Sequence, residues 1–210
     1  MTRRKNPYAN DPRTRAAKAQ GYPARSIFKL QEIDQRVRLL KPGQRVLDLG
    51  AAPGSWSLYA SQRVGASGRV VAVDLKPIEQ AFPSQVAVIQ GDALSVKSEA
   101  ILAAAPFDVV LSDMAPSTSG NKQRDQVMSY ELFDGALLVA AEFGRAGGHF
   151  VGKLFMGPDF EAARQAVRDR YAQCKVIRPV GTRTVSSEVF LVGMALRRGS
   201  ESSPPQAEGG

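Results

Sequence analysis

The stretch from Arg45 to Trp56, RVLDLGAAPGSW, constrains the fold of this chain more than any other. Its apolar start predicts a short buried strand, which stops at an acid and is followed by glycines. Gly50 and Gly54 allow the backbone to approach a ligand closely, and the residues from Pro53 onward predict a helix. A strand, a glycine loop and a helix form the nucleotide site of an open α/β sheet. The stretch contains neither Gly-x-Gly-x-x-Gly nor Gly-Lys-Ser/Thr, which excludes the dinucleotide fingerprint and the phosphate loop.

Three apolar runs end in acids, which are Asp48, Asp74 and Asp92. The carboxyl ends of parallel strands meet at one edge of a sheet, so we expect these acids to lie there together. The acid of the second strand can accept both ribose hydroxyls of an adenosine. A single acid of this kind is usually a solvated loop residue. Three in register resemble the S-adenosylmethionine pocket of Rossmann-like methyltransferases.

The rest of the chain alternates apolar strands with helices. We expect helices at 26–40, 95–105, 130–145 and 158–171, and strands at 107–113, 149–155, 173–177 and 189–196. This alternation predicts an α/β fold of the Rossmann-like type, with a mostly parallel seven-stranded sheet and helices on both faces. The last strand is expected to be antiparallel, because the loop before it is too short for a crossover helix. The polar residues 117–126 are expected to form a flexible lip beside the site.

Length and composition restrict the class of protein. At 210 residues, with 43% hydrophobic and 23% charged residues, the chain predicts one main domain with a sizeable core. No apolar segment reaches the roughly 20 residues of a membrane span. Cys174 is the only cysteine, which excludes an internal disulfide and favours the reducing cytoplasm. His149 is also single, so no His/Cys metal cluster is expected. We expect a cytoplasmic monomer without a metal.

The positive charge is concentrated near the start of the chain. Residues 1–41 hold 11 lysines and arginines against three acids, whereas residues 42–210 hold 17 of each. We therefore expect three parts, which are a basic and partly flexible RNA-binding arm at 1–24, the main domain at 25–198 and a disordered tail at 199–210. Tyr8 and Tyr22 lie among the arginines and are candidates for stacking on bases. On charge alone, a solubilising segment is the alternative.

Five segments taken together resemble one known family. They are Phe28-Lys29-Leu30, the stretch from Asp48 to Trp56, Ser112-Asp-Met-Ala-Pro116, Gly152-Lys153-Leu-Phe155 and Ser187-Glu188-Val189. In this order they are similar to the FtsJ/RrmJ family of S-adenosylmethionine-dependent RNA ribose 2′-O-methyltransferases. The resemblance extends from about residue 12 to residue 198.

The resemblance implies which residues act. The family's catalytic tetrad corresponds to Lys29, Asp113, Lys153 and Glu188. Its contacts to S-adenosylmethionine correspond to Gly54, Trp56, Asp74, Asp92 and Asp113. The chain departs from the family at Ser55, where glycine is common, and at Gly152, where a β-branched residue is common. These departures concern the shape of the loop and the rigidity of the strand.

Two lysines and two acids suit the implied chemistry. Methyl transfer to a ribose hydroxyl is an in-line displacement, so the enzyme must hold the oxygen about 3 Å from the methyl carbon. It must also accept the hydroxyl proton. Lys153 is the candidate base if it is neutral when it acts. A neighbouring Lys29 disfavours the charged form of Lys153, whereas nearby carboxylates favour it. The alternative is a protonated Lys153 that only orients the hydroxyl.

The substrate implied by the resemblance is RNA. The compact length favours 23S ribosomal RNA of the large subunit, with uridine as the nucleotide, over transfer RNA. Two other functions remain open. Asp113-Met-Ala-Pro116 is faintly similar to the Asp/Asn-Pro-Pro-Tyr/Phe loop of methyltransferases that modify base nitrogens. A non-catalytic RNA-binding or ribosome-assembly factor could keep the same pocket, although an intact tetrad argues against it.

Overall fold

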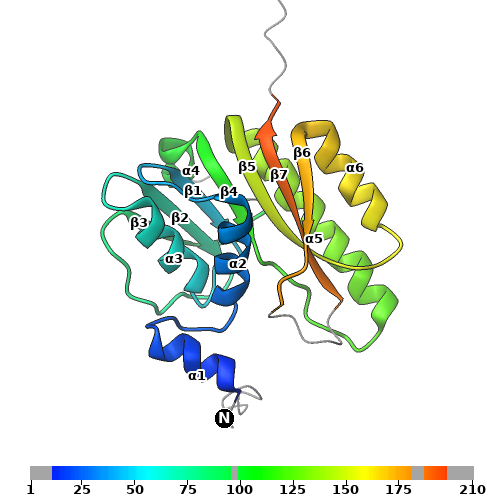
Figure 1. Cartoon of the computed structure of the whole chain (residues 1–210), viewed down its shortest axis with the longest axis horizontal. Helices are drawn as coiled ribbons and strands as arrows, with labels where there is room; N and C mark the ends of the chain where they lie inside the picture. The colour runs from blue at the N-terminus through cyan, green and yellow to red at the C-terminus, as the bar shows by residue number, and fades with distance from the viewer. Residues whose placement is uncertain (1–10, 96–98, 181–186, 198–210) are drawn as a thin grey trace, which may run out of the picture.

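The computed structural model describes residues 11–95, 99–180 and 187–197 (Figure 1). Its centre is a seven-stranded sheet in the order β3-β2-β1-β4-β5-β7-β6. The strands are β1 (Arg45–Leu49), β2 (Arg69–Asp74), β3 (Val86–Gln90), β4 (Phe107–Ser112), β5 (Gly144–Phe155), β6 (Tyr171–Ile177) and β7 (Glu188–Leu196). The helices are α1 (Pro12–Ala19), α2 (Ile27–Val37), α3 (Ser55–Val64), α4 (Glu99–Ala104), α5 (Lys122–Phe143) and α6 (Phe160–Arg170).

The sheet has the predicted Rossmann-like topology. Strands β1 to β5 pair in parallel, and β7 lies between β5 and β6, antiparallel to both. The strand order reverses between β1 and β4, because the chain proceeds outward to β3 on one side and to β5 on the other. Ligands of open α/β sheets bind at the carboxyl ends of the strands beside such a reversal. The topology therefore directs attention to the loops after β1 and β4.

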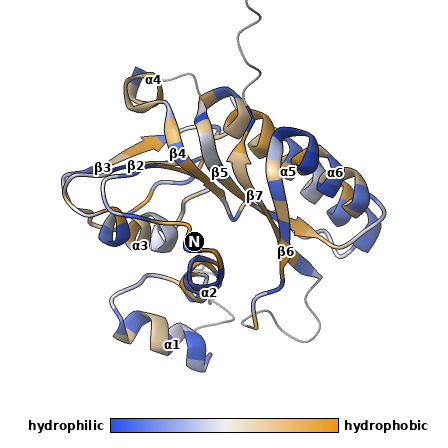
Figure 2. Cartoon of the chain, turned by 45° about the horizontal axis from the view of Figure 1, so that its top comes forward, coloured by the Kyte–Doolittle hydropathy of each residue, from blue (hydrophilic) through white to orange (hydrophobic). Residues whose placement is uncertain are grey.

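Helices cover both faces of the sheet (Figure 2). Helices α4, α5 and α6 pack on one face and α2 and α3 on the other. Neighbouring residues of one strand enter opposite cores, since Val46 packs with α2 and α3 while Leu47 packs with α4 and α5. This explains the continuous apolar runs of the central strands. In the described ranges, no helix is long and apolar enough to cross a membrane.

The basic N-terminal segment is folded from residue 11 onward. Asp11 caps α1 by accepting a hydrogen bond from the Arg13 amide. Ala17 is fully buried and Tyr22 is 7% exposed, and both pack with Ile27. The Tyr22 hydroxyl donates to Gln62 Oε1 at 2.6 Å. The prediction that Tyr22 stacks on bases is therefore wrong, because its side chain is buried against the domain. The polar composition of the segment gave no sign that Ala17 and Tyr22 are buried. Tyr8 and the tail predicted at 199–210 lie outside the described residues.

Helix α5 and strand β5 both begin earlier than the sequence pattern predicted. The polar residues expected in the flexible lip include the cap of α5, because the Asn121 side chain accepts a hydrogen bond from the Arg124 amide. Asp125 then fixes the preceding loop by accepting from the Ser119 amide at 2.9 Å. At the other end, the chain passes directly from helix to strand, and Gly144 pairs with Phe107. The predicted lip is thus shorter, and Gly147 and Gly148, which follow the helix predicted at 130–145, lie inside β5.

Two polar links join the start of α3 to the segment before α2. The Ser55 hydroxyl is 1% exposed, accepts from the Ala24 amide at 2.8 Å and donates to the Ala24 carbonyl at 3.1 Å. The Trp56 indole nitrogen donates to the Ser26 carbonyl at 2.9 Å. The Ser55 side chain, at the position where the sequence differs from the family that it resembles, therefore forms a fixed connection that a glycine could not make.

We expect Ser55→Ala to lower the free energy of unfolding by about 1–2 kcal/mol, because it leaves the Ala24 amide and carbonyl without this partner. Urea unfolding followed by circular dichroism measures the change. The exposed Ser67, changed to alanine, is the matched control and should stay within about 0.5 kcal/mol of the wild type. Equal stability of the Ser55→Ala variant and the wild type would show that the connection contributes nothing.

Candidate active site

The structure brings the four predicted catalytic residues into one cluster at the carboxyl edge of the sheet. Lys153 Nζ lies 2.9 Å from Asp113 Oδ1. Lys29 Nζ lies 2.8 Å from Glu188 Oε2 and 3.6 Å from Asp113 Oδ1. The cluster is thus a chain of alternating lysines and acids that runs from Lys153 through Asp113 and Lys29 to Glu188.

Strand register explains how residues so distant in sequence meet. Ser112 pairs with Gly152, so Asp113, which follows the end of β4, lies beside Lys153 within β5. Across the antiparallel pair, Glu188 is opposite Phe155. Because alternate residues of a strand share a face, Glu188 projects on the same side of the sheet as Lys153.

Lys29 reaches the cluster from the first turn of α2. That helix is held on the sheet by Leu30 and Ile33, which are fully buried in the same core as Phe190. The Lys29 ammonium lies 5.7 Å from the centre of the Phe190 ring, which adds a cation–π contact. The apolar stripe of α2 therefore aims Lys29 at the carboxylates instead of at solvent.

The electrostatics of the cluster define two fixed charges. Burial raises the pKa of Asp113, but Lys153 and then Lys29 outweigh it, so the pKa lies below its ordinary value. Burial lowers the pKa of Lys29, but Asp113 and Glu188 outweigh it, so the pKa lies above its ordinary value. Asp113 is therefore a carboxylate and Lys29 an ammonium at neutral pH.

Among the residues that the structure describes, Asp113 makes the polar contacts to Lys153 Nζ. The Lys153 side chain is almost fully buried, and Nζ donates to the Asp113 backbone carbonyl at 2.5 Å as well as lying beside the carboxylate. Asp113 Oδ1 is buried and accepts no well-aligned hydrogen bond from the described residues, despite its short distance to Lys153. The Asp113 side chain therefore acts on Lys153 through charge, while the carbonyl sets its direction.

A cavity of about 320 Å³ adjoins the cluster. Three of the predicted cofactor residues, Asp74, Asp92 and Asp113, line it together with Gly50 and Met114. Asp113 thus belongs to both the cavity and the lysine cluster. This shared residue places the two parts of the predicted site in contact.

Backbone amides hold the two acids of β2 and β3. Asp74 accepts from the Ala52 amide at 2.9 Å and from the Lys76 amide at 2.8 Å. Asp92 accepts from the Leu94 amide at 3.0 Å and from the Ser95 hydroxyl at 2.8 Å. These hydrogen bonds, first that from Leu94 and then that from Ser95, hold the pKa of Asp92 below its ordinary value. Each carboxylate keeps unused lone pairs for a ligand.

The glycine loop requires glycine for two reasons. Gly50 has φ +75°, and a Cβ there would lie 2.4 Å from Met114 Cγ. Gly54 has φ +106°, and a Cβ there would lie 2.9 Å from Phe82 Cζ. The absence of a side chain at Gly50 leaves room for the Met114 side chain, which lines the cavity. The absence of a side chain at Gly54 lets residues 78–82 pack on the loop. Gly54 does not line the cavity itself, so its predicted cofactor contact stays a prediction.

The Trp56 side chain points into the core. Its indole is 3% exposed and packs on Phe190, with 5.8 Å between ring centres. A cofactor contact of Trp56 could therefore be made only by its backbone amide, which lies in the first turn of α3, where amides have no partner within the helix. The cofactor contact predicted for Trp56 stays a prediction, and the buried indole restricts it to the main chain.

Asp48 does not line the cavity with the other acids. It is 1% exposed, and the Ser57 hydroxyl donates to its Oδ2 at 2.6 Å. Burial raises the pKa of Asp48 to about 7, and the nearby Asp113 and Asp74 add to this against the Ser57 hydrogen bond. The expectation of three acids around one pocket holds for Asp74 and Asp92, whereas Asp48 supports the start of α3. In the sequence, Asp48 is marked only by its position before the glycines. Its burial and its hydrogen bond to Ser57 show that it supports α3.

Among the residues that the structure describes, no three His, Cys, Asp or Glu side chains gather in a metal-binding arrangement.

Comparison with known proteins finds similar sequences over most of the chain. Residues 22–196 match the model of a family described as FtsJ-like methyltransferase. The chain is 63% identical over 191 residues to the ribosomal RNA large subunit methyltransferase E of Sorangium cellulosum, and the alignment covers 90% of both proteins. It is 50% identical over 184 residues to the protein of the same name from Syntrophobacter fumaroxidans, covering 87% of this chain and 93% of that one.

Solved structures show the same fold. A structure described as a ribosomal RNA methyltransferase from Plasmodium falciparum superimposes with a TM-score of 0.74 at 24% identity, over 83% of this chain and 98% of that one. Fibrillarin from Aeropyrum pernix, solved with natively bound S-adenosyl-L-methionine, superimposes with a TM-score of 0.56 at 16% identity, over 74% of this chain and 68% of that one. The family match and the identities, which extend over most of the chain, show that the protein belongs to the FtsJ-like methyltransferase family.

Proposed function

We propose that the protein transfers a methyl group from S-adenosylmethionine to the ribose 2′-hydroxyl of a uridine in 23S ribosomal RNA of the large subunit. The observation that carries this proposal is the contact between the cluster of Lys29, Asp113, Lys153 and Glu188 and a cavity lined by three acids. The names of the similar proteins support ribosomal RNA over transfer RNA as the substrate.

The cavity residues fit S-adenosylmethionine, which when bound supplies an electrophilic methyl group on a sulfonium. Asp74 would accept the adenosine ribose hydroxyls, since backbone amides fix both of its oxygens and leave further lone pairs. Asp92 would contact the adenosine at the same edge. The carboxylate of Asp113 suits a positively charged ligand and lies where the cavity meets Lys153. The loop from Gly50 to Gly54 and the Trp56 amide complete the proposed contacts.

Lys153 is the residue that we assign to the target hydroxyl. A protonated lysine has three donors, of which the Asp113 carbonyl accepts one, while the Asp113 carboxylate lies beside Nζ as a charge. A remaining donor would orient the ribose oxygen. A neutral Lys153 would instead present its lone pair there and take the proton. In both cases Asp113 determines where Nζ points, and the charged pair of Lys29 and Glu188 forms the outer part of the site.

RNA binding is assigned first to the basic N-terminal segment. Arg15 and Lys18 are exposed on α1, which lies near the start of α2 and thus near Lys29 (Figure 1). Lysines and arginines in such a position neutralise RNA phosphates, which makes binding salt-dependent. We propose that the protein works in this way as a cytoplasmic monomer.

Mass spectrometry of nucleosides tests the proposed function directly. We expect 2′-O-methyluridine after the protein is incubated with S-adenosylmethionine and large ribosomal subunits from a strain that lacks the activity. Product in transfer RNA instead would change the substrate. A base-methylated nucleoside would show a base N-methyltransferase, and absence of any product would favour a non-catalytic assembly factor.

A further inference from the structure

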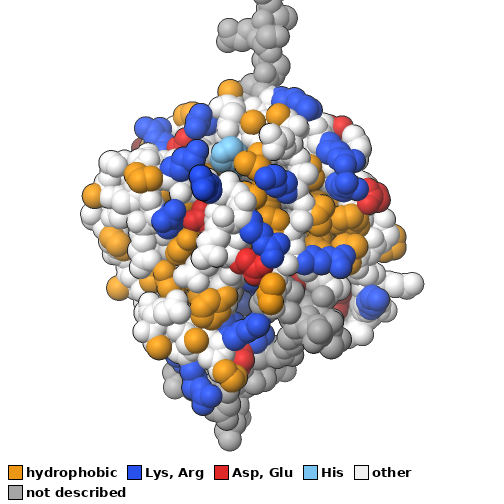
Figure 3. Space-filling model, in the orientation of Figure 1, with side chains coloured by type: hydrophobic (Ala, Val, Ile, Leu, Met, Phe, Trp, Pro, Cys, Tyr) orange, Lys and Arg blue, Asp and Glu red, His pale blue; other side chains and the backbone are white. Residues whose placement is uncertain are grey.

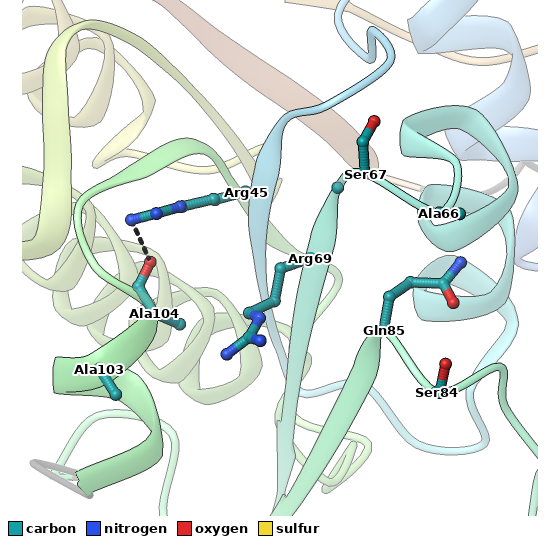
Figure 4. A pocket seen from close by; sticks show the side chains of 9 residues that line it. Arg45, Ala66, Ser67, Arg69, Ser84, Gln85, Ala103 and Ala104 are labelled. Atoms are coloured by element: carbon teal, nitrogen blue, oxygen red, sulfur yellow. Dashed lines mark hydrogen bonds between the residues drawn. The ribbon is translucent and has the colours of Figure 1, made fainter.

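A second cavity lies at the amino ends of β1 and β2, at the opposite end of the strands from the proposed methyl-transfer site. It has a volume of about 510 Å³ and is lined by the side chains of Arg45, Ser67, Arg69, Ser84 and Gln85 (Figure 4). Arg45 and Arg69 are paired in the register of β1 and β2, so the two guanidinium groups start from adjacent positions. The cavity thus combines two cations with two hydroxyl groups.

The two arginines have different partners. Arg45 Nη1 donates to the carbonyls of Ala104 and Ala105, at 3.5 and 3.3 Å, and so compensates the negative end of α4. Within the described ranges, no carboxylate lies within ion-pair distance of the Arg69 guanidinium, which is exposed in the cavity. A guanidinium without a carboxylate partner suits a phosphate group, because its planar fork donates two parallel hydrogen bonds to phosphate oxygens.

Positive charge continues along this edge of the sheet. Lys41 lies before β1 and Arg145 at the start of β5, and Asp108 is committed to the Arg145 guanidinium and the Arg45 amide. Burial is the main cause that holds the pKa of His149 below its ordinary value, and the charges of Lys41 and Arg145 lower it further against that of Asp108. Figure 3 shows lysine and arginine side chains gathered around this histidine.

We propose that this basic edge, defined by Lys41, Arg45, Arg69 and Arg145, binds phosphates of an RNA segment other than the one that carries the target ribose. The five residues of β1 alone separate the two edges by about 17 Å at roughly 3.3 Å per residue. A nucleotide placed at Lys153 therefore does not bring its own phosphate to Arg69. Because the cations extend beyond the cavity, they fit a polyanion better than a single phosphate. The inference rests on the proposed RNA substrate.

The test is Arg69→Ala, measured by filter binding to a 23S ribosomal RNA transcript at several KCl concentrations. Loss of one phosphate contact should reduce the slope of log affinity against log salt by about one and weaken binding several-fold. Binding to an eight-nucleotide RNA that contains the target uridine should not change, and neither should affinity for S-adenosylmethionine. Lys175→Ala, an exposed cation on β6, is the control and should keep the full slope.

Four results would overturn the proposal. The first is that Arg69→Ala keeps the full salt slope on the transcript, and the second is that Lys175→Ala loses as much affinity as Arg69→Ala. The third is that Arg69→Ala weakens binding of the short RNA as much as binding of the transcript. The fourth is saturable binding of inorganic phosphate that requires Arg69, while affinity for the transcript does not change. The last would reveal a site for a small anion instead. These assays measure binding and not turnover, so failure of the proposed methylation would be recognised separately by nucleoside analysis.

Discussion

Lys153→Ala is expected to reduce methyl transfer to RNA by at least about 10²–10⁴-fold, the usual contribution of a positioned proton acceptor. Loss of alignment of the target hydroxyl would add to this. Affinity for S-adenosylmethionine should barely change, because Lys153 does not line the acid-lined cavity. Single-turnover incorporation of labelled methyl groups and calorimetric titration of the cofactor measure the two effects. Substantial 2′-O-methyl product from the variant would contradict the assignment of Lys153.

Lys153→Arg separates the two roles of this residue. Arginine keeps the charge but does not lose its proton near neutral pH. Turnover close to that of the wild type would mean that charge and orientation are sufficient. An inactive variant whose circular dichroism and cofactor affinity match those of the wild type would favour Lys153 as a base. The larger planar group of arginine could also displace the ribose, so the pH dependence of the rate is needed as well.

The pH dependence of the rate gives independent information on Lys153. If Lys153 is the base, activity rises with pH as it loses its proton. Asp48, whose pKa is raised to about 7, also loses a proton near neutral pH. Because it lies near Asp113, its titration could produce a similar rise in the rate. Asp48→Asn removes that titration while keeping an acceptor for Ser57. A rise that persists in this variant belongs to a different group, whereas a flat profile would assign the rise to Asp48.

Asp74→Ala is expected to weaken binding of S-adenosylmethionine roughly 30- to 150-fold, which corresponds to a loss of about 2–3 kcal/mol. Two causes contribute. The variant removes the acceptor proposed for the adenosine ribose hydroxyls, and it leaves the Ala52 amide of the glycine loop and the Lys76 amide after β2 without their partner. Calorimetric titration measures the affinity, and the rate at saturating cofactor should change much less.

Two further variants sharpen this result. Asp74→Asn keeps the shape and one acceptor oxygen but loses the charge, so its affinity should fall between those of the wild type and Asp74→Ala. Asp169→Ala removes an acid from α6, remote from the cavity, and should bind the cofactor normally. Normal affinity of Asp74→Ala would refute the proposed position of the ribose.

The sequence alone determined the class of fold and the membership of the cluster. Apolar strand runs are local signals, and parallel strands necessarily bring their carboxyl ends to one edge. Asp74 and Asp92 could therefore be placed together from their positions after β2 and β3. The four charged residues of the cluster were predicted from short motifs, which stand in the same order as in the family that the sequence resembles.

The tertiary structure decided what depends on contacts between distant segments. Glu188 reaches Lys29 because β7 inserts antiparallel beside β5, and a loop length cannot specify which strand is the neighbour. The Trp56 indole turns into the core and Asp48 is buried beside Ser57 of α3, because α2 and α3 pack on this face of the sheet. A residue pattern gives the period of exposure along one element, whereas the direction and burial of each side chain are set by the elements that pack against it.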